Sequence, residues 1–283
     1  MRTRALGKTG IQVPAIGQGT WQLRDARAAE EALLEGLRLG MVHVDTAELY
    51  EWGSGSETLL GGLLSKPGED GRPWREHCVL ASKVHPRNGA AKAVASACKD
   101  SLVRLQTDRL DLYYHHWRGG QAPLEETLQA LAGLVDAGWV RAIGVSNYDV
   151  EDLEEAQAVL GRGRIAANQV LYHLEDRGAE AEVSPWCRRH GVTLVAYSPF
   201  GSGAFVRSGR AAAELDAVAS EAGCTPRQAA LAFLVREPHV VAIPKAEKVA
   251  HVRENAGGDL KLRKEHVERI DAAFPVRGGL RTI

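Results

Sequence analysis

Cysteine is scarce in this sequence, and its spacing argues against a disulfide framework. The four cysteines, Cys78, Cys98, Cys187 and Cys224, are widely separated and form no C-x-x-C pair. Small secreted domains and many zinc sites depend on closely paired cysteines. We therefore expect free, buried thiols.

Long apolar runs and an excess of charge of one sign are also missing. No stretch of about 18 apolar residues occurs, and the amino-terminal segment is polar and turn-forming, so neither a membrane span nor a secretion signal is expected. The 35 lysines and arginines are scattered among 36 aspartates and glutamates, which argues against a nucleic-acid partner. The sequence has no exposed heptad pattern that would indicate assembly into an oligomer. The sequence predicts a cytoplasmic monomer that acts on a small molecule.

Metal-ligand patterns are absent as well, although the chain has ten histidines. No H-x-H pair closes the first apolar run and no H-E-x-x-H occurs, so the ligand sets of metal-dependent hydrolases are missing. We expect no metal ion in the site.

The sequence does contain a regular alternation of short apolar runs and helical patterns. Runs rich in Val, Ile, Leu and Ala are typical of parallel strands buried on both faces, and eight of them cover residues 15–21, 41–47, 78–83, 111–117, 140–147, 165–172, 192–199 and 240–245. The clearest helical patterns cover 26–39, 90–105, 124–136, 150–159 and 211–222. Since a (β/α)8 TIM barrel needs roughly 250 residues, this α/β chain is predicted to be one barrel domain over residues 1–283.

Polar side chains stand at the carboxyl ends of the predicted strands, where barrel enzymes carry their chemistry. Asp45, Lys83 and His116 end the second, third and fourth strands, and Tyr50 lies in the predicted loop after the second. Alone, a tyrosine after a strand is usually a packed aromatic, and a lysine there is usually solvated. Together, these four residue types can protonate a carbonyl oxygen, which favours hydride transfer to an aldehyde or ketone.

Tyr50 is the predicted proton donor. A tyrosine has a reference pKa of about 10, and a Lys83 ammonium held by Asp45 would favour the phenolate and lower that pKa. His116 would hydrogen-bond the same carbonyl oxygen and orient the substrate. His115 is the competing histidine, but alternation along a strand sends it to the opposite face.

Nine segments, in this order along the chain, resemble those of the aldo-keto reductase family. They are GQGTW at 17–21, VDTAELY at 44–50, ASK at 81–83, DLYYHHW at 111–117, GVSN at 144–147, NQV at 168–170, AYSP at 196–199, IPK at 243–245 and EN at 254–255. The resemblance implies a barrel whose bottom is capped by an N-terminal β-hairpin at 4–14. It also implies a reductase that moves a hydride from a nicotinamide cofactor to a carbonyl compound.

The resemblance further implies where that cofactor binds. The only approximate G-x-G-x-x-A match, at 161–166, precedes a strand and so lacks the context of a dinucleotide fingerprint. In a barrel of this family the nicotinamide would stack on Tyr197, and the short loop 200–210 could fold over the pyrophosphate. The residues expected to contact the cofactor are Gly19, Thr20, Trp21, Asp45, Ser146, Asn147, Gln169, Tyr197, Ser198, Pro199, Phe200, Gly201, Ile243, Pro244, Lys245, Ala246, Lys248, His251, Glu254 and Asn255.

The residues after the eighth strand bear on the choice between NADPH and NADH. Family members selective for NADPH commonly carry a hydroxyl residue and an arginine where this chain has Ala246 and His251. Lys245 and Lys248 remain to supply positive charge for a 2′-phosphate. We expect NADPH to be preferred and NADH to be used less well.

The substrate site is expected to be apolar and open. Trp21, Trp52 and Trp117 would form its walls together with Tyr50 and His116, as is normal for small-molecule sites. The expected substrates are small aldehydes and ketones, including 2-oxoaldehydes and sugar-derived or aromatic aldehydes. The alternative function is a non-enzymatic regulatory module that senses nicotinamide cofactor, and turnover of bound NADPH with an aldehyde separates the two.

Overall fold

A computed structural model describes residues 1–206 and 208–281 of the chain. Within these residues, an antiparallel hairpin precedes a sheet of eight parallel strands, each hydrogen-bonded to the next one along the chain. The hairpin strands are β1 (Thr3–Ala5) and β2 (Gln12–Pro14). The sheet strands are β3 (Gln18–Gly19), β4 (His43–Asp45), β5 (Val79–Val84), β6 (Leu112–His115), β7 (Ile143–Ser146), β8 (Ile165–Leu171), β9 (Thr193–Tyr197) and β10 (Val240–Ala242).

Contacts between the first and last strands close the sheet into the predicted barrel. Parallel bridges join Ile16 to Ala242 and Gly19 to Lys245, and the Gly17 N–H donates to the Ala242 carbonyl at 2.8 Å. A Cβ on Gly19 would lie 2.8 Å from the Ile243 carbonyl oxygen, so this close approach requires glycine. Only isolated bridges join the first strand of the sheet to the last. The strands β3 and β10 are therefore shorter than the predicted runs 15–21 and 240–245.

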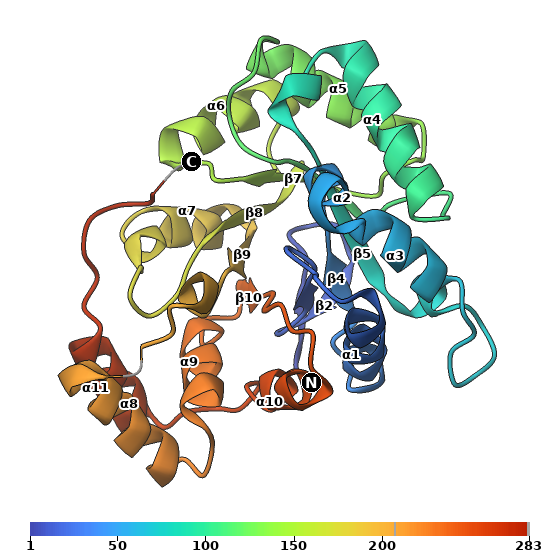
Figure 1. Ribbon diagram of the computed structural model, residues 1–283. Helices are drawn as coiled ribbons and strands as arrows, with labels where there is room; N and C mark the ends of the chain where they lie inside the picture. Colours follow the sequence, from blue (N-terminus) through green and yellow to red (C-terminus); the bar gives the residue numbers. More distant parts are fainter. Residues whose placement is uncertain (207, 282–283) are drawn as a thin grey trace.

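Helices surround the strands, and α10 packs beside α1 where the ring closes (Figure 1). The α-helices of the described residues are α1 (Ala26–Arg38), α2 (Glu48–Ser54), α3 (Ser56–Leu64), α4 (Ala91–Arg104), α5 (Leu124–Asp136), α6 (Val150–Leu160), α7 (Val183–His190), α8 (Gly209–Glu221), α9 (Pro226–Leu234), α10 (Val249–Ala256) and α11 (Lys264–Ala273). The 3₁₀ helices are η1 (Trp74–His77), η2 (Pro86–Asn88), η3 (Gly178–Glu180) and η4 (Gly201–Gly203).

The five clearest predicted helices are confirmed, and side-chain caps explain where two of them begin. Asp25 accepts hydrogen bonds from two backbone N–H groups of α1, and Asp149 forms a capping box with Asp152 at the start of α6. Such caps satisfy N–H groups that have no partner inside the helix. The prediction that Tyr50 lies in a loop is wrong, because this residue lies in the short helix α2.

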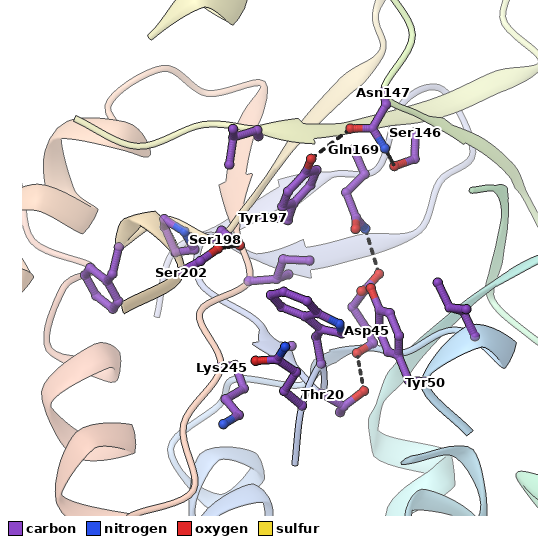
Figure 2. A pocket seen from close by; sticks show the side chains of 18 of the residues that line it. Thr20, Asp45, Tyr50, Ser146, Asn147, Gln169, Tyr197, Ser198, Ser202 and Lys245 are labelled. Carbon is purple, nitrogen blue, oxygen red and sulfur yellow. Dashed lines mark hydrogen bonds between the residues drawn. The ribbon is translucent and has the colours of Figure 1, made fainter. Parts of the chain in front are cut away.

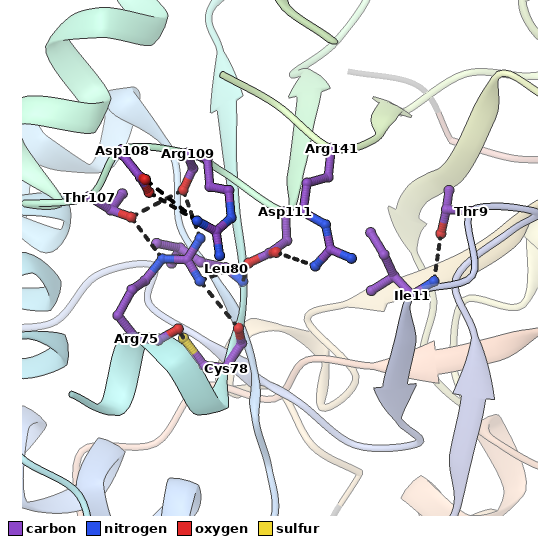
Figure 3. Close-up of polar contacts among 10 residues, drawn as sticks. All are labelled: Thr9, Ile11, Arg75, Cys78, Leu80, Thr107, Asp108, Arg109, Asp111 and Arg141. Atoms are coloured by element: carbon purple, nitrogen blue, oxygen red, sulfur yellow. Dashed lines mark hydrogen bonds and ion pairs between the residues drawn. The ribbon is translucent and has the colours of Figure 1, made fainter. Parts of the chain in front are cut away.

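The amino-terminal hairpin and a buried carboxylate hold the bottom of the barrel together. The Thr193 hydroxyl accepts the Gly7 N–H at 2.9 Å and donates to the Ala5 carbonyl at 3.0 Å, which ties the hairpin to the start of β9. Asp111, just before β6, accepts the Leu80 N–H of β5 at 2.9 Å. Arg75 and Arg141 flank the same carboxylate at 2.9 and 2.8 Å (Figure 3). These hydrogen bonds and ion pairs stabilise the bottom of the barrel.

The four cysteines are free, as expected from their spacing. Burial raises the pKa of Cys78, Cys98 and Cys187 to about 12, whereas Cys224 is only half-buried. None of the helices formed by residues 1–206 and 208–281 has the length and apolar character needed to span a membrane.

Candidate active site

A cavity of about 720 Å³ opens at the carboxyl ends of the strands. In Figure 2, Asp45 and Tyr50 lie toward one side of it, and Ser198, Ser202 and Lys245 lie toward the other. Its lining residues are Gly19, Thr20, Trp21, Gln22, Asp45, Leu49, Tyr50, His116, Trp117, Ser146, Asn147, Gln169, Leu171, Tyr197, Ser198, Pro199, Phe200, Ser202, Gly203, Arg227, Ile243 and Lys245.

Asp45, Lys83 and Tyr50 form a chain of polar contacts at one side of the cavity. The Lys83 side chain comes from β5 and is fully buried. Its ammonium donates to Asp45 Oδ1 at 2.5 Å and to the Thr46 carbonyl at 2.7 Å, and it lies 3.5 Å from Tyr50 Oη. Because Asp45 ends β4 and Tyr50 lies in the first turn of α2, neighbouring elements bring the three groups together.

Burial and charge act in opposite directions on these groups. Burial opposes the positive charge of Lys83, but Asp45 and Tyr50 outweigh it and raise the pKa of Lys83. Burial raises the pKa of Tyr50, the Lys83 ammonium lowers it, and burial prevails. The predicted lowering of the Tyr50 pKa is therefore wrong for this structure, because desolvation of the phenolate outweighs its attraction to the ammonium. Tyr50 stays protonated at neutral pH, with a cation beside it that would stabilise the anion.

The two adjacent histidines point to different surroundings. His116 lines the cavity, and its ring meets the Tyr50 ring edge-on with centroids 5.8 Å apart. His115 is buried away from the cavity, where its Nδ1 lies 2.7 Å from the Tyr148 hydroxyl. Burial, with Lys83 nearby, lowers the pKa of His116 well below its usual value. A neutral His116 ring keeps one N–H that can donate to a ligand.

Amide and hydroxyl groups from β7, β8 and β9 form a second cluster in the cavity. The Asn147 side chain accepts the Tyr197 hydroxyl at 2.9 Å and donates to Ser146 Oγ at 3.0 Å. Gln169 donates to Asp45 Oδ2 at 2.7 Å (Figure 2), and its backbone carbonyl accepts the Asn147 N–H at 2.8 Å. Gln169 therefore joins the cluster to the polar chain of Asp45 and Lys83. Asn147 has a φ of +60°, which is uncommon for non-glycine residues but is tolerated by asparagine better than by most.

Two cationic side chains, Lys245 and Arg227, also belong to the cavity lining. Lys245 Nζ is 3.4 Å from a Glu247 carboxylate oxygen, and the other oxygen of Glu247 accepts the Arg24 N–H. Arg227, in the first turn of α9, also lines the cavity. Its guanidinium lies 4.7 Å from the ring centroid of Phe200 and 4.8 Å from that of Phe205.

Most of the residues predicted to contact a cofactor or substrate line the cavity, and some do not. Trp52 is outside the lining: α2 turns its side chain away from that of Tyr50, and its ring packs 3.6 Å from the Arg87 guanidinium. The other predicted residues outside the lining are Gly201, Pro244, Ala246, Lys248, His251, Glu254 and Asn255. Arg207, within the predicted 200–210 loop, lies outside the described residues.

Sequence reasoning also missed some lining residues. They are Gln22, Leu49, Leu171, Ser202, Gly203 and Arg227. Leu171 lies within the predicted strand 165–172, and Ser202 and Gly203 lie within the predicted loop, so their positions alone could have suggested them. The position of Arg227 could not be predicted, because the neighbouring sequence does not indicate that the first turn of its helix faces the cavity. Within the described part of the chain, no three His, Cys, Asp or Glu side chains form a group that could hold a metal ion.

The sequence and fold of this chain are similar to those of known reductases. The sequence model of the Aldo/keto reductase family matches residues 15–274. Methylglyoxal reductase YeaE of Escherichia coli (strain K12) is 37% identical over 275 residues, which are 95% of this chain and 94% of that protein. Glyoxal reductase of Bacillus subtilis (strain 168) is 31% identical over 266 residues, or 93% of this chain and 90% of that protein. The crystal structure of an aldo/keto reductase from Klebsiella pneumoniae in complex with NADP and acetate has a TM-score of 0.89, with 37% sequence identity over 100% of both chains.

Proposed function

Because this chain belongs to the aldo/keto reductase family, we propose that it reduces small aldehydes and ketones to alcohols with NADPH, and that Tyr50 is the proton donor. The observation that carries the proposal is the contact of Tyr50 Oη with the buried Lys83 ammonium at 3.5 Å, beside His116 in the same cavity. These groups come from α2, β5 and the end of β6. A proton donor and a neutral hydrogen-bond donor thus line one cavity, and a buried cation lies directly behind the proton donor.

Each of these groups has a distinct task in the proposed reaction. A bound NADPH supplies the hydride, which forms the new C–H bond at the carbonyl carbon as the C=O π bond breaks. The carbonyl oxygen takes the proton of the Tyr50 hydroxyl, and the resulting phenolate later regains a proton from solvent. Lys83 stabilises the developing phenolate, and Asp45 holds the ammonium in place. His116 donates a hydrogen bond to the carbonyl oxygen as negative charge builds on it.

The cavity fits a nicotinamide dinucleotide in its donor set. Ser146, Asn147 and Gln169 offer amide and hydroxyl groups in the lining of the cavity that Tyr50 also lines, as a carboxamide requires. Lys245 and Arg227 offer positive charge elsewhere in the lining, as phosphates require. The NADP complex of the Klebsiella pneumoniae relative agrees with this fit. We propose that NADPH is preferred over NADH, with Lys245 and Lys248 available to a 2′-phosphate.

The substrate class is proposed from the cavity walls and from the relatives. Trp21, Leu49 and Trp117 form apolar walls beside Tyr50 and His116, and Trp21 is 45% exposed at the opening. Because two similar proteins are named methylglyoxal reductase and glyoxal reductase, 2-oxoaldehydes are the first substrates to test. A cytoplasmic location, a monomeric state and a single domain over residues 1–283 stay predictions of the sequence.

The proposed function is tested by removing one hydroxyl. Oxidation of NADPH is followed with 2-oxoaldehydes, simple aldehydes and aldoses in the unmodified enzyme, in Tyr50→Phe and in Tyr148→Phe. The control removes a tyrosine hydroxyl outside the cavity lining. We expect Tyr50→Phe to lower kcat by roughly a hundredfold or more while NADPH still binds, and Tyr148→Phe to retain most turnover. Equal turnover in Tyr50→Phe and Tyr148→Phe would exclude Tyr50 as proton donor. NADPH binding without turnover by any of the three proteins would favour the sensing alternative.

A further inference from the structure

Arg227 differs from the other cationic side chain of the cavity lining in how its charge is balanced. Lys245 has Glu247 at 3.4 Å. Across residues 1–206 and 208–281, no carboxylate oxygen lies within 4 Å of the Arg227 guanidinium. An arginine that lines a cavity and has no acidic partner there retains its charge for a ligand, and carboxylates and phosphates are the groups that arginine binds best.

Two aromatic rings hold this guanidinium in place. Phe200 and Phe205 meet edge to face, with centroids 5.6 Å apart and planes at 90°, and the guanidinium lies within 5 Å of both centroids. Cation–π contacts of this kind orient an arginine. Since they use the π faces of the rings and do not consume N–H groups, the donors at the edge of the guanidinium stay available.

The segment that carries these rings also supplies hydroxyl groups. Ser198 and Ser202 line the cavity, and their hydroxyls are 3.0 Å apart. Both have positive φ values, 47° and 54°, a conformation that costs free energy for residues other than glycine and must be held by the surrounding structure. Arg227 thus lies beside a turn that presents hydroxyl donors to the same cavity.

We propose that Arg227 binds the diphosphate bridge of the cofactor, with Phe200 and Phe205 as positioning residues. The inference rests on the proposed nicotinamide site and assigns a residue that the family resemblance did not provide. Lys245 belongs to a different segment, after β10, and is the expected partner of the 2′-phosphate. Arg227 therefore contributes affinity for NADPH and NADH alike, whereas Lys245 contributes to the difference between them.

Binding measurements without a carbonyl substrate separate these contributions. Dissociation constants of NADPH, NADH, adenosine 5′-diphosphate and adenosine 2′-phosphate are measured by titration calorimetry for the unmodified protein, Arg227→Met and Arg189→Met. The control removes the same charge from an exposed arginine of α7. We expect Arg227→Met to weaken NADPH, NADH and adenosine 5′-diphosphate by a similar factor, about tenfold or more. Adenosine 2′-phosphate should bind within twofold of its original affinity, and Arg189→Met should change nothing.

Two results would overturn the assignment. Unchanged NADPH and NADH binding in Arg227→Met would show that the side chain does not contact the cofactor. A loss confined to NADPH and adenosine 2′-phosphate would assign Arg227 to the 2′-phosphate instead. Failure of the unmodified protein to bind either dinucleotide would be a different outcome, since it refutes the proposed cofactor site as a whole.

A double-mutant cycle tests the positioning by the aromatic rings. Phe205→Leu keeps an apolar side chain but removes one ring face. We expect it to weaken NADPH binding about threefold when Arg227 is present and to have no effect in the Arg227→Met background. Equal losses in both backgrounds would show that Phe205 acts independently of Arg227. Thermal unfolding of each variant establishes that the comparison is made between folded proteins.

Discussion

Glu247 competes with the proposed cofactor for Lys245. The carboxylate lies 3.4 Å from the ammonium, and a 2′-phosphate would need the same charge. In Glu247→Gln the amide oxygen can still accept the Arg24 N–H, but the ion pair is lost. We expect the ratio of kcat/KM for NADPH to that for NADH to rise a few-fold. The change is small because a partly exposed ion pair such as Lys245–Glu247 contributes less than about 1 kcal/mol. Glu69→Gln, at an exposed loop position, is the control, and an unchanged ratio in Glu247→Gln would show that Glu247 does not compete.

The adjacent histidines provide a second test by substitution. His116 lines the cavity, whereas His115 is bonded to Tyr148 outside it. We expect His116→Asn to lower kcat/KM by roughly a hundredfold, because a hydrogen bond to the carbonyl oxygen is lost or displaced. His115→Asn should keep most of the kcat/KM. Steady-state kinetics with one aldehyde decides the matter, and equal losses in the two variants would contradict the assignment of His116.

The sequence could predict that Asp45, Tyr50, Lys83 and His116 lie close together, because each lies at or soon after the end of a predicted strand. It could not predict the Glu247 contact, since the ion pair with Lys245 and the bond to Arg24 depend on how two loops meet. The direction of the Tyr50 pKa was also beyond it, because that direction depends on how fully the phenolate would be desolvated. Trp52 shows the same limit: a loop was predicted there, and the helix α2 turns the ring toward Arg87.

The strands around Asp111 depend on a buried carboxylate far from the cavity. Asp111 connects β5, η1 and the segment that leads into β7 through Leu80, Arg75 and Arg141. In Asp111→Asn both arginines lose their acidic partner. The Arg141 side chain is 49% exposed, but that of Arg75 is only 14% exposed, so the charge of Arg75 is left largely buried and uncompensated. We expect the free energy of unfolding in urea to fall by roughly 3 kcal/mol, while kcat/KM of the folded enzyme stays the same.

The exposed Asp108 offers the matched control for that prediction. Its side chain is 82% exposed and pairs with Arg109 at 3.3 Å, and an exposed pair of this kind contributes less than about 1 kcal/mol. Asp108→Asn should therefore leave the free energy of unfolding nearly unchanged. If Asp111→Asn were equally mild, the strands would not depend on this carboxylate.

The barrel was predictable from the alternation of apolar runs and helices, because strands buried on both faces leave continuous apolar segments. Short helices such as α2 were not predictable in this way. Only seven residues long, α2 is too short to form without tertiary contacts. In the folded chain, Glu48 at its start accepts the His85 N–H at 2.6 Å and an Asn88 N–H at 3.0 Å. A contact between residues so far apart in sequence leaves no periodic signal.

Stability should depend on pH because several histidines are buried in neutral form. Burial lowers the pKa of His43, His115 and His116, and that of His115 falls from 6.5 to about 4. Between those two values the unfolded chain binds a proton at His115 and the folded chain does not. Acidification from pH 7 toward pH 4 therefore favours unfolding, and His115 alone accounts for up to about 3 kcal/mol.

Urea unfolding at a series of pH values between neutrality and the acid range measures this dependence. In His115→Asn the slope of unfolding free energy against pH should become shallower, since one site of proton uptake by the unfolded chain is gone. Tyr148→Phe removes the hydrogen bond to His115 but leaves the ring buried. It should lower stability at every pH and keep the original slope, because burial is the main cause of the lowered pKa. A slope in His115→Asn as steep as that of the unmodified protein would mean that protonation of His115 does not drive the loss of stability in acid.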